Sequence, residues 1–352
     1  MLRRVTQPIL DIAFHGDAAE IAGVAAEAEA RGVGGLFVAE AAHDPYIAMA
    51  LAGQASSKIQ IGSSVAIAFA RTPMSTAYSA WDVHRLSSSG GPPNSEGVAV
   101  GGRLILGLGT QIKPHITRRF DMPWSSPAPR MSEYVEALRA IFDSFQNGEK
   151  LDFQGDFYSH TLLPPLFNPG PIDGGPPPIW LAAVGPRMLA ATGAVADGLI
   201  CHPLLSRSYL DEVIVPTVAA GRAGGTHADE PFTTSVLCMV ATGRNEEELA
   251  AAIAGTKRQI GFYASTPAYL PVLEHHGWDD LHKDAHAFTK SGRWTELGDL
   301  IPDEVLSMFA VVGDLDTARA EFRSRFAGSA QRVITSINYD TDKLLAIDLV
   351  SD

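Results

Sequence analysis

Four side chains that can donate or accept a proton lie at the ends of apolar segments of this 352-residue sequence. His15, Glu40 and His202 each follow such a segment directly, and His43 comes shortly after Glu40. Barrel enzymes place their chemistry at the carboxyl ends of their strands, so we expect these groups to converge on one pocket. The sequence has no Gly-x-Ser-x-Gly motif and no nucleophile–base spacing that would indicate hydrolysis. So few catalytic groups are typical of an enzyme whose cofactor performs the reaction.

The segment 58–73, KIQIGSSVAIAFARTP, reads as a strand that is interrupted in its middle. Its apolar residues are typical of a buried strand, but Gly62, Ser63 and Ser64 break the run. Glycine and short polar residues inside such a strand mark either a simple bulge or the close approach of a ligand. Both interpretations are open on these residues alone.

Two glycine motifs follow later strands. The first, ILGLGT at 105–110, resembles a dinucleotide-binding turn, but its third glycine is missing and Pro114 interrupts the expected helix start. We therefore favour a flat ligand lying against Gly107 and Gly109 over a dinucleotide-binding fold.

The second motif, LAAVGPRM at 181–188, predicts the start of a helix directly after a strand. Val184, Gly185 and Pro186 open this helix, and Arg187 lies in its first turn. Free backbone N–H groups at a helix N-terminus attract anions, so this turn is a candidate phosphate site. The alternative is an ordinary strand-to-helix turn.

Apolar strands alternate with helices over almost the whole chain, which predicts either a (β/α)8 barrel or a doubly wound sheet. The expected strands are 8–14, 34–39, 59–69, 103–109, 178–183, 198–201, 232–242 and 332–338. The expected helices are 17–31, 44–56, 73–86, 130–145, 186–193, 206–223, 245–263 and 314–326. Segments outside this repeat are a Gly/Pro/Ser loop at 87–102, a small hairpin within 150–175 and a mostly helical stretch at 263–306. Nothing indicates a second domain, so we expect a single domain over 1–352.

Composition excludes several classes of function. The formal charge of −13 and the lack of a basic stripe argue against nucleic-acid binding. No apolar run is long enough for a transmembrane helix, and the N-terminus lacks a signal-peptide cleavage site. Cys201 and Cys238 are far apart, and the eleven histidines form no metal-binding motif, so we expect no metal. These features predict a cytoplasmic protein that acts on a small molecule.

The sequence resembles the luciferase-like monooxygenase superfamily, and within it the branch of oxidoreductases that use coenzyme F-420. The resemblance runs nearly end to end and rests on GLFVAEAAHDPYIAMAL, IGSSVAIAFARTPMSTAYSAWD, LILGLGTQIKPHITRRFDMPW, RMSEYVEALRAIF, LAAVGPRM, VADGLICHP, RQIGFYASTPAYLPVLEHHGWDDL and FAVVGD. It implies a luciferase-like TIM barrel with insertions, and it extends to an assembly of two or more subunits.

The resemblance also assigns expected roles to individual positions. A non-proline cis peptide at Ser64-Val65 would back the central ring of the deazaflavin. Glu40 matches an acidic position close to that ring, and His202 matches a strand end that often faces the substrate. The remaining expected cofactor contacts are Gly109, Thr110, Gln111, Val184, Gly185, Pro186 and Arg187.

The sequence departs from the family pattern in three places. Ala41 stands where some members have a histidine that assists proton transfer, so Glu40, His43 and His202 are the candidate acid–base residues. The apolar run at 203–205 argues against a phosphorylated substrate. The loop at 87–102 is longer than usual; it is expected away from the pocket, as disordered chain or an oligomer contact.

These observations predict an F-420-dependent oxidoreductase that transfers a hydride between the deazaflavin and an organic substrate. The alternatives are an FMN-dependent monooxygenase of the same fold and a flavin-binding or deazaflavin-binding protein without turnover. Aromatic residues that could wall the pocket or belong to the core are Trp124, Phe262, Tyr263 and Trp278.

Overall fold

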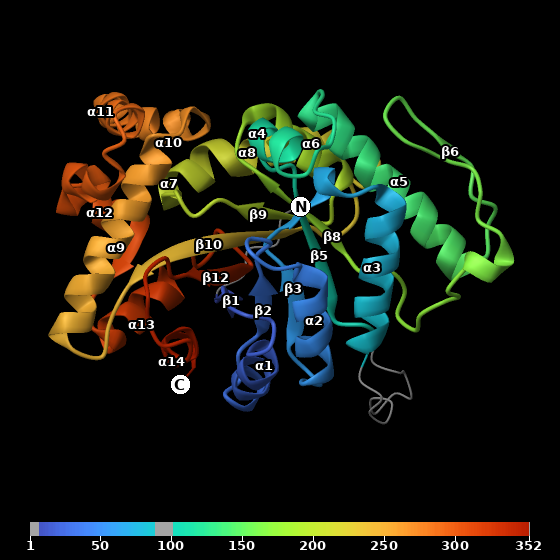
Figure 1. The fold of residues 1–352 in the computed structure, drawn as a ribbon, viewed down its shortest axis with the longest axis horizontal. Coiled ribbons are helices and arrows are strands. Elements are labelled where there is room, and N and C mark those ends of the chain that lie inside the picture. Colours follow the sequence, from blue (N-terminus) through green and yellow to red (C-terminus); the bar gives the residue numbers. More distant parts are fainter. Residues whose placement is uncertain (1–6, 89–100, 352) are drawn as a thin grey trace.

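Eight parallel strands close into a barrel in the computed structural model, which describes residues 7–88 and 101–351 (Figure 1). Each strand pairs with the next along the chain, and the last pairs with the first, so the expected barrel is confirmed over a doubly wound sheet. The eight are β1 (Ile9–Phe14), β2 (Gly35–Val38), β3 (Gln60–Ser63), β5 (Leu104–Gly109), β8 (Ile179–Ala183), β9 (Gly198–Cys201), β10 (Thr233–Ala241) and β12 (Arg332–Ser336).

The helices between these strands begin where the sequence supplies caps. Asp44 accepts the N–H of Tyr46 at 2.8 Å and starts α2, and Thr72 accepts the N–H of Ser75 at 3.2 Å and starts α3. The connecting helices are α1 (Ile21–Ala30), α2 (Pro45–Gln54), α3 (Pro73–Leu86), α5 (Pro127–Asn147), α6 (Pro186–Val195), α8 (Val215–Ala223), α9 (Glu246–Ala264) and α13 (Leu315–Ser324). The expected helix 206–223 is divided into α7 (Arg207–Tyr209), a π-helical turn (Leu210–Ile214) and α8.

Shorter elements lie outside the repeat. The expected hairpin consists of β6 (Phe153–Gln154) and β7 (Ser159–His160), and it projects from the molecule near α5 (Figure 1). The stretch 263–306 is helical, as predicted, while residues 89–100 of the expected loop 87–102 lie outside the described residues. Elements not predicted include α4 (Lys113–Arg118), β11 (Ala310–Val312) and α14 (Leu345–Val350). The stretch predicted as helical contains α10 (Leu270–His275), α11 (Asp279–Lys290) and the start of α12 (Asp303–Phe309).

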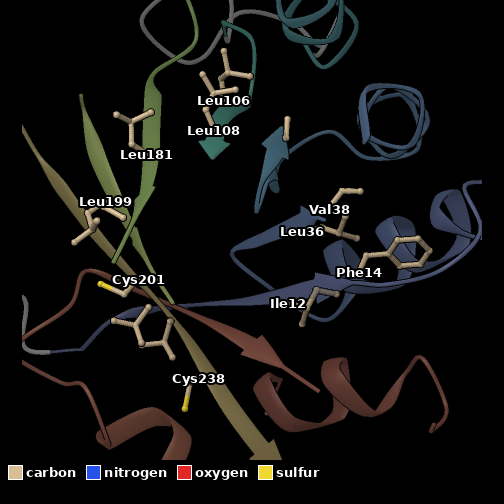
Figure 2. Close-up of a cluster of buried hydrophobic side chains, with 14 of the residues drawn as sticks. Ile12, Phe14, Leu36, Val38, Leu106, Leu108, Leu181, Leu199, Cys201 and Cys238 are labelled. Carbon is tan, nitrogen blue, oxygen red and sulfur yellow. The ribbon is translucent and has the colours of Figure 1, made fainter. Parts of the chain in front are cut away.

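Two apolar layers result from the alternation of side chains along each strand. One alternate set packs outside the barrel against the helices, and Figure 2 shows Ile12, Leu36, Leu106, Leu181 and Leu199 of this set. The other set fills the barrel interior with Phe37, Ile105, Trp180, Ile200 and Ile334. Large side chains therefore block the barrel lumen, and open space is left only near its ends.

Strand β10 changes its pairing partner near its carboxyl end. Its first residues pair with β9 as far as Val236, which lies opposite Cys201, the last residue of β9. Met239–Ala241 pair instead with β11. Leu237, between these two pairings, lines the cavity at the end of the barrel where the sequence places its acid–base residues.

A buried ion pair fixes the opposite end of the barrel. Arg332 donates from Nε and Nη2 to the two carboxylate oxygens of Asp11 at 2.7 and 2.6 Å, and Nη1 also contacts Gln60. Asp11 has no solvent-exposed surface. The pair joins β12, β1 and β3 across the barrel, and removal of one charge would leave the other buried without a partner.

We therefore expect Asp11→Asn to lower the free energy of unfolding by about 3–5 kcal/mol. Asp316→Asn is the matched control, because Asp316 pairs with Arg319 at 2.9 Å but its side chain is 92% exposed. The control should cost about 1 kcal/mol or less. Urea denaturation followed by circular dichroism measures both, and equal losses would contradict the structural role of the buried pair.

Candidate active site

A cavity of about 660 Å³ lies at the carboxyl ends of the barrel strands. It is lined from most sides of the barrel, including Ala13 of β1, Gly109 of β5, Ala182 of β8, Leu237 of β10 and Ser336 of β12. The five cofactor positions expected at and after the ends of β3 and β5 all line it: Ser64, Val65, Gly109, Thr110 and Gln111.

Small residues occupy several inward positions of the strands at the floor of this cavity. Ala13, Gly109, Ala182 and Ser336 lie above the larger side chains of the barrel interior. A Cβ atom added to Gly109 would lie 2.7 Å from Cγ2 of Val65, so a side chain at this position would rise into the floor. The floor can thus accommodate a planar ring system.

A bulge in the third strand shapes one side of the floor. Gly62 pairs with Ile105 and Ala66 with Leu108, so three residues of this strand lie opposite two residues of β5. The hydroxyl of Ser63 replaces the missing ladder bonds, because it donates to the carbonyl of Gly107 at 2.7 Å and accepts its N–H at 3.0 Å. The strand resumes as β4 (Ala66–Ile67).

The peptide bond between Ser64 and Val65 is cis, as the sequence resemblance implied. Both of its flanking polar groups are bonded to β2 and its continuation: Ser64 N–H donates to the carbonyl of Val38 at 2.8 Å, and Val65 accepts the N–H of Glu40 at 3.2 Å. The buried Ser64 hydroxyl has no partner among the described residues. Ser64 lines the cavity, although this oxygen itself is buried.

Glu40 lines the cavity, but its carboxylate is fully engaged by the chain. Arg71 donates from Nη1 to both oxygens at 2.9 and 2.8 Å, and the N–H of Ile67 donates to Oε2 at 2.7 Å. The side chain of Glu40 is only 5% exposed. Arg71 also donates from Nη2 to Asp44 at 2.8 Å. Glu40 is therefore placed to hold the segment after the bulge.

Arg71 is one of the site residues that sequence reasoning missed. The run Arg71-Thr72-Pro73 marks the end of the interrupted strand and the start of a helix, which explains the proline but not the arginine. The signal that could have identified it is the pair of acids on the preceding strand end, Glu40 and Asp44, which need a common cation.

His202 faces the cavity as a neutral imidazole. Its Nδ1 accepts the N–H of Leu204 at 3.1 Å, so the ring proton is on Nε2. Burial lowers its pKa from 6.5 to about 3, so the ring is uncharged at neutral pH. Tyr269 stacks on it with 4.1 Å between ring centroids, and Tyr263 meets it edge-on at 4.5 Å. His202 is thus a hydrogen-bond donor, while a role as base would require the other tautomer and the loss of the Leu204 bond.

The structure brings only some of the other expected acid–base residues to this cavity. His15 lines it from the end of β1. Desolvation by the surrounding protein lowers its pKa, although the residue is partly exposed to solvent. His43 is exposed and is not among the lining residues. Asp44 caps α2 and pairs with Arg71, which explains its position by structure alone.

The N-terminus of α6 borders the cavity. Val184 and Gly185 are lining residues, whereas Pro186 and Arg187 are exposed and are not among them. No side chain caps this helix, so its first N–H groups remain available to an anion. Lys113, at the start of α4, lines the same side of the cavity.

Aromatic residues wall the cavity, and they are partly those expected. Trp124 and Tyr263 line it, and Tyr269, which was not predicted, lines it as well. Phe262 is 43% exposed. Trp278 is not among the lining residues and stacks on His276, with 4.9 Å between ring centroids.

A model of the family described as luciferase-like monooxygenase matches residues 4–332. The chain belongs to the luciferase-like monooxygenase family. Members of this family are oxidoreductases, including monooxygenases, and the chain is accordingly an oxidoreductase. No helix among residues 7–88 and 101–351 is long and apolar enough to cross a membrane.

Two relatives illustrate the range of sequence similarity. An uncharacterized protein of Mycobacterium tuberculosis is 45% identical over 325 residues, which cover 92% of each chain. A putative coenzyme F-420-dependent oxidoreductase of the same organism is 27% identical over 336 residues, which cover 88% of this chain and 89% of the relative.

Two solved structures share the luciferase-like fold. The coenzyme F-420-dependent tetrahydromethanopterin reductase of Methanopyrus kandleri has a TM-score of 0.73 at 20% identity, covering 99% of this chain and 97% of that one. The oxygenating constituent of 3,6-diketocamphane monooxygenase of Pseudomonas putida, solved with FMN, has a TM-score of 0.63 at 15% identity, covering 98% and 97%. At these identities the likeness concerns the fold alone.

Substitution of Gly107 tests the bulge. A Cβ atom there would lie 1.9 Å from the carbonyl oxygen of Ser63, so Gly107→Ala must displace backbone. We expect it to lower the free energy of unfolding by about 1–3 kcal/mol. The control Gly23→Ala lies in α1 with nothing within 4 Å of the added atom. It should raise stability by about 0.5–1 kcal/mol, and denaturant melts compare the two.

Burial of His202 predicts a pH dependence of stability. Between pH 6.5 and about 3 the unfolded chain binds a proton at this imidazole that the folded chain does not. The free energy of unfolding should therefore fall as pH falls through this window. His202→Gln removes this contribution, so its slope against pH should be smaller by up to about 1.4 kcal/mol per pH unit. Parallel slopes in urea melts of the two proteins would refute the buried neutral imidazole.

Proposed function

We propose that the protein binds coenzyme F-420 in this cavity and transfers a hydride between the deazaflavin and an organic substrate. The observation that carries the proposal is the floor formed by the Ser64-Val65 bulge with Gly109 and Ala182. The end-to-end relative described as a putative F-420-dependent oxidoreductase supports the choice of cofactor.

The residues present fit a phosphorylated tricyclic cofactor. The small residues of the floor leave room for a planar ring system. The uncapped N-terminus of α6, at Val184 and Gly185, would hold a phosphate. Lys113 lies on the same side and would pair with further negative charge of the cofactor. Thr110 and Gln111 would flank the chain between ring and phosphate. When bound, the deazaflavin supplies two-electron hydride chemistry.

The roles of the chain's own residues follow from their bonds. Glu40 keeps the ring floor in place through Arg71 and the N–H of Ile67, so we assign it a positioning role in place of the proton transfer that the sequence suggested. His202 would donate its Nε2–H to the reacting group of the substrate. His43, exposed and not among the lining residues, has no assigned role in this proposal.

The second candidate is an FMN-dependent monooxygenase. It is favoured by the FMN-bound structure with the same fold and by the same floor, which an isoalloxazine ring would also fit. The cavity geometry does not distinguish two tricyclic rings that each carry a phosphorylated side chain.

Titration of the cofactor-free protein with F-420 and with FMN distinguishes the two candidates. We expect one F-420 to bind per chain with micromolar or tighter affinity, followed by fluorescence, and FMN to bind at least about ten-fold more weakly. Micromolar binding of FMN without F-420 binding would establish the monooxygenase candidate instead.

A substitution on the floor tests whether the cofactor ring binds there. Gly109→Ala adds a methyl group beside Val65, and we expect the affinity for F-420 to fall by about ten-fold or more. Gly23→Ala, far from the cavity in α1, serves as the matched control and should bind like the unmodified protein. Unchanged affinity in Gly109→Ala with an intact thermal transition would show that the ring lies elsewhere.

A further inference from the structure

The carboxyl end of β9 and the wall beside it form an uncharged, aromatic part of the cavity. It consists of His202, Pro203, Leu237, Tyr263 and Tyr269. We propose that this part, called the aromatic end below, binds an uncharged ring-containing substrate with an oxygen acceptor, which receives the Nε2–H of His202. The proposal rests on the proposed function, because it assigns the remaining space beside the cofactor to the substrate.

Charge is distributed unevenly around the cavity mouth. Among the described lining residues, Glu40 and Lys113 are the charged side chains at neutral pH, and Arg71 already neutralises Glu40. Lys113 follows β5, and the N-terminus of α6 follows β8. The aromatic end lies further along, at β9 and β10, since the strands are adjacent in that order. An anionic group can therefore bind on the β5–β8 side, near Lys113 and the N-terminus of α6. The aromatic end has no cationic side chain among the described lining residues to pair with an anion.

The aromatic end has a packed and ordered shape. Tyr269 lies on His202 at an interplanar angle of 23°, and Tyr263 is nearly perpendicular to both, at 75° to His202 and 81° to Tyr269. Burial raises the pKa of Tyr269 to about 12, so its hydroxyl stays protonated at neutral pH. Leu237 lies in β10 directly after Val236, which pairs with the last residue of β9. These faces and edges match a ring compound of low polarity.

The turn that carries these tyrosines is held from behind by two histidines. Tyr263 lies at the end of α9, and Tyr269 ends the short helix Pro267–Tyr269 that follows. His282 of α11 donates from Nδ1 to the carbonyl of Ala264 at 2.6 Å, and His286 donates likewise to Ser265 at 3.1 Å. The aromatic end is thus braced before any ligand arrives, which limits the entropy lost on binding.

His202 gives the aromatic end its one directed donor. Leu204 occupies Nδ1, so the imidazole presents Nε2–H, for which no described residue acts as acceptor. A neutral donor stabilises a carbonyl or hydroxyl oxygen. It compensates poorly for the desolvation of a carboxylate or phosphate, which needs a paired cation in a buried site. The geometry therefore selects a neutral oxygen function over an anionic one.

Three ligands of similar shape test this assignment on the cofactor-loaded protein: acetophenone, benzoate and ethylbenzene. We expect acetophenone to bind about five-fold or more tightly than ethylbenzene, because it accepts a hydrogen bond, and benzoate to bind most weakly of the three. Ligand-observed NMR titration measures all three affinities without turnover. Equal or tighter binding of benzoate, or no binding of any of the three, would overturn the substrate class.

Two variants connect the preference to His202. His202→Phe keeps an aromatic ring beside Tyr269 but removes the donor, so the acetophenone-to-ethylbenzene ratio should fall to about one; His202→Gln keeps an N–H donor and should retain part of it. A preserved ratio in His202→Phe would refute the role of Nε2–H. F-420 binding is titrated separately for each variant. Loss of F-420 binding would count against the proposed function. Intact F-420 binding with an unchanged acetophenone-to-ethylbenzene ratio in His202→Phe would count against the substrate class alone.

Discussion

The ion pair between Glu40 and Arg71 is the interaction on which the candidate site depends. It joins the end of β2 to the segment that leaves the bulge, and its second nitrogen reaches Asp44 at the start of α2. A third bond to the N–H of Ile67 fixes the chain just beyond the cis peptide. The cluster acts together with the bonds between Ser63 and Gly107 and with the backbone bonds that join Ser64 and Val65 to Val38 and Glu40.

The sequence suggested proton transfer for both Glu40 and His202, but their bonds in the structure differ. In the proposed function Glu40 serves to position the floor, and His202 is kept neutral by burial, with its bond to Leu204 setting the tautomer. A site with a fixed anion, a neutral donor and a floor of small residues is suited to orienting two ligands in contact. It leaves the electron transfer to the cofactor, as is usual for redox enzymes of this kind.

Much of the fold could be predicted from the sequence because the strands are apolar on both faces and the helices carry caps. The expected strand 103–109 and helix 73–86 agree with β5 and α3 to within a residue. β11 was not predicted, because three residues of a strand are too short to show a period and its pairing partner lies some seventy residues away. The helices within 263–306 were predicted only as a group, since α10 and α11 pack mainly against other helical segments.

The sequence by itself determined the order of strands and helices, the interrupted strand and the small residues beside it, since these depend on local composition. It also determined which acids and histidines lie at strand ends. Only the tertiary structure decided what those groups can do. Arg71 reaches Glu40 from thirty-one positions away, and Leu204 and Tyr269 set the tautomer and surroundings of His202. Protonation and hydrogen bonding depend on neighbours in space, and no pattern along the chain records those neighbours.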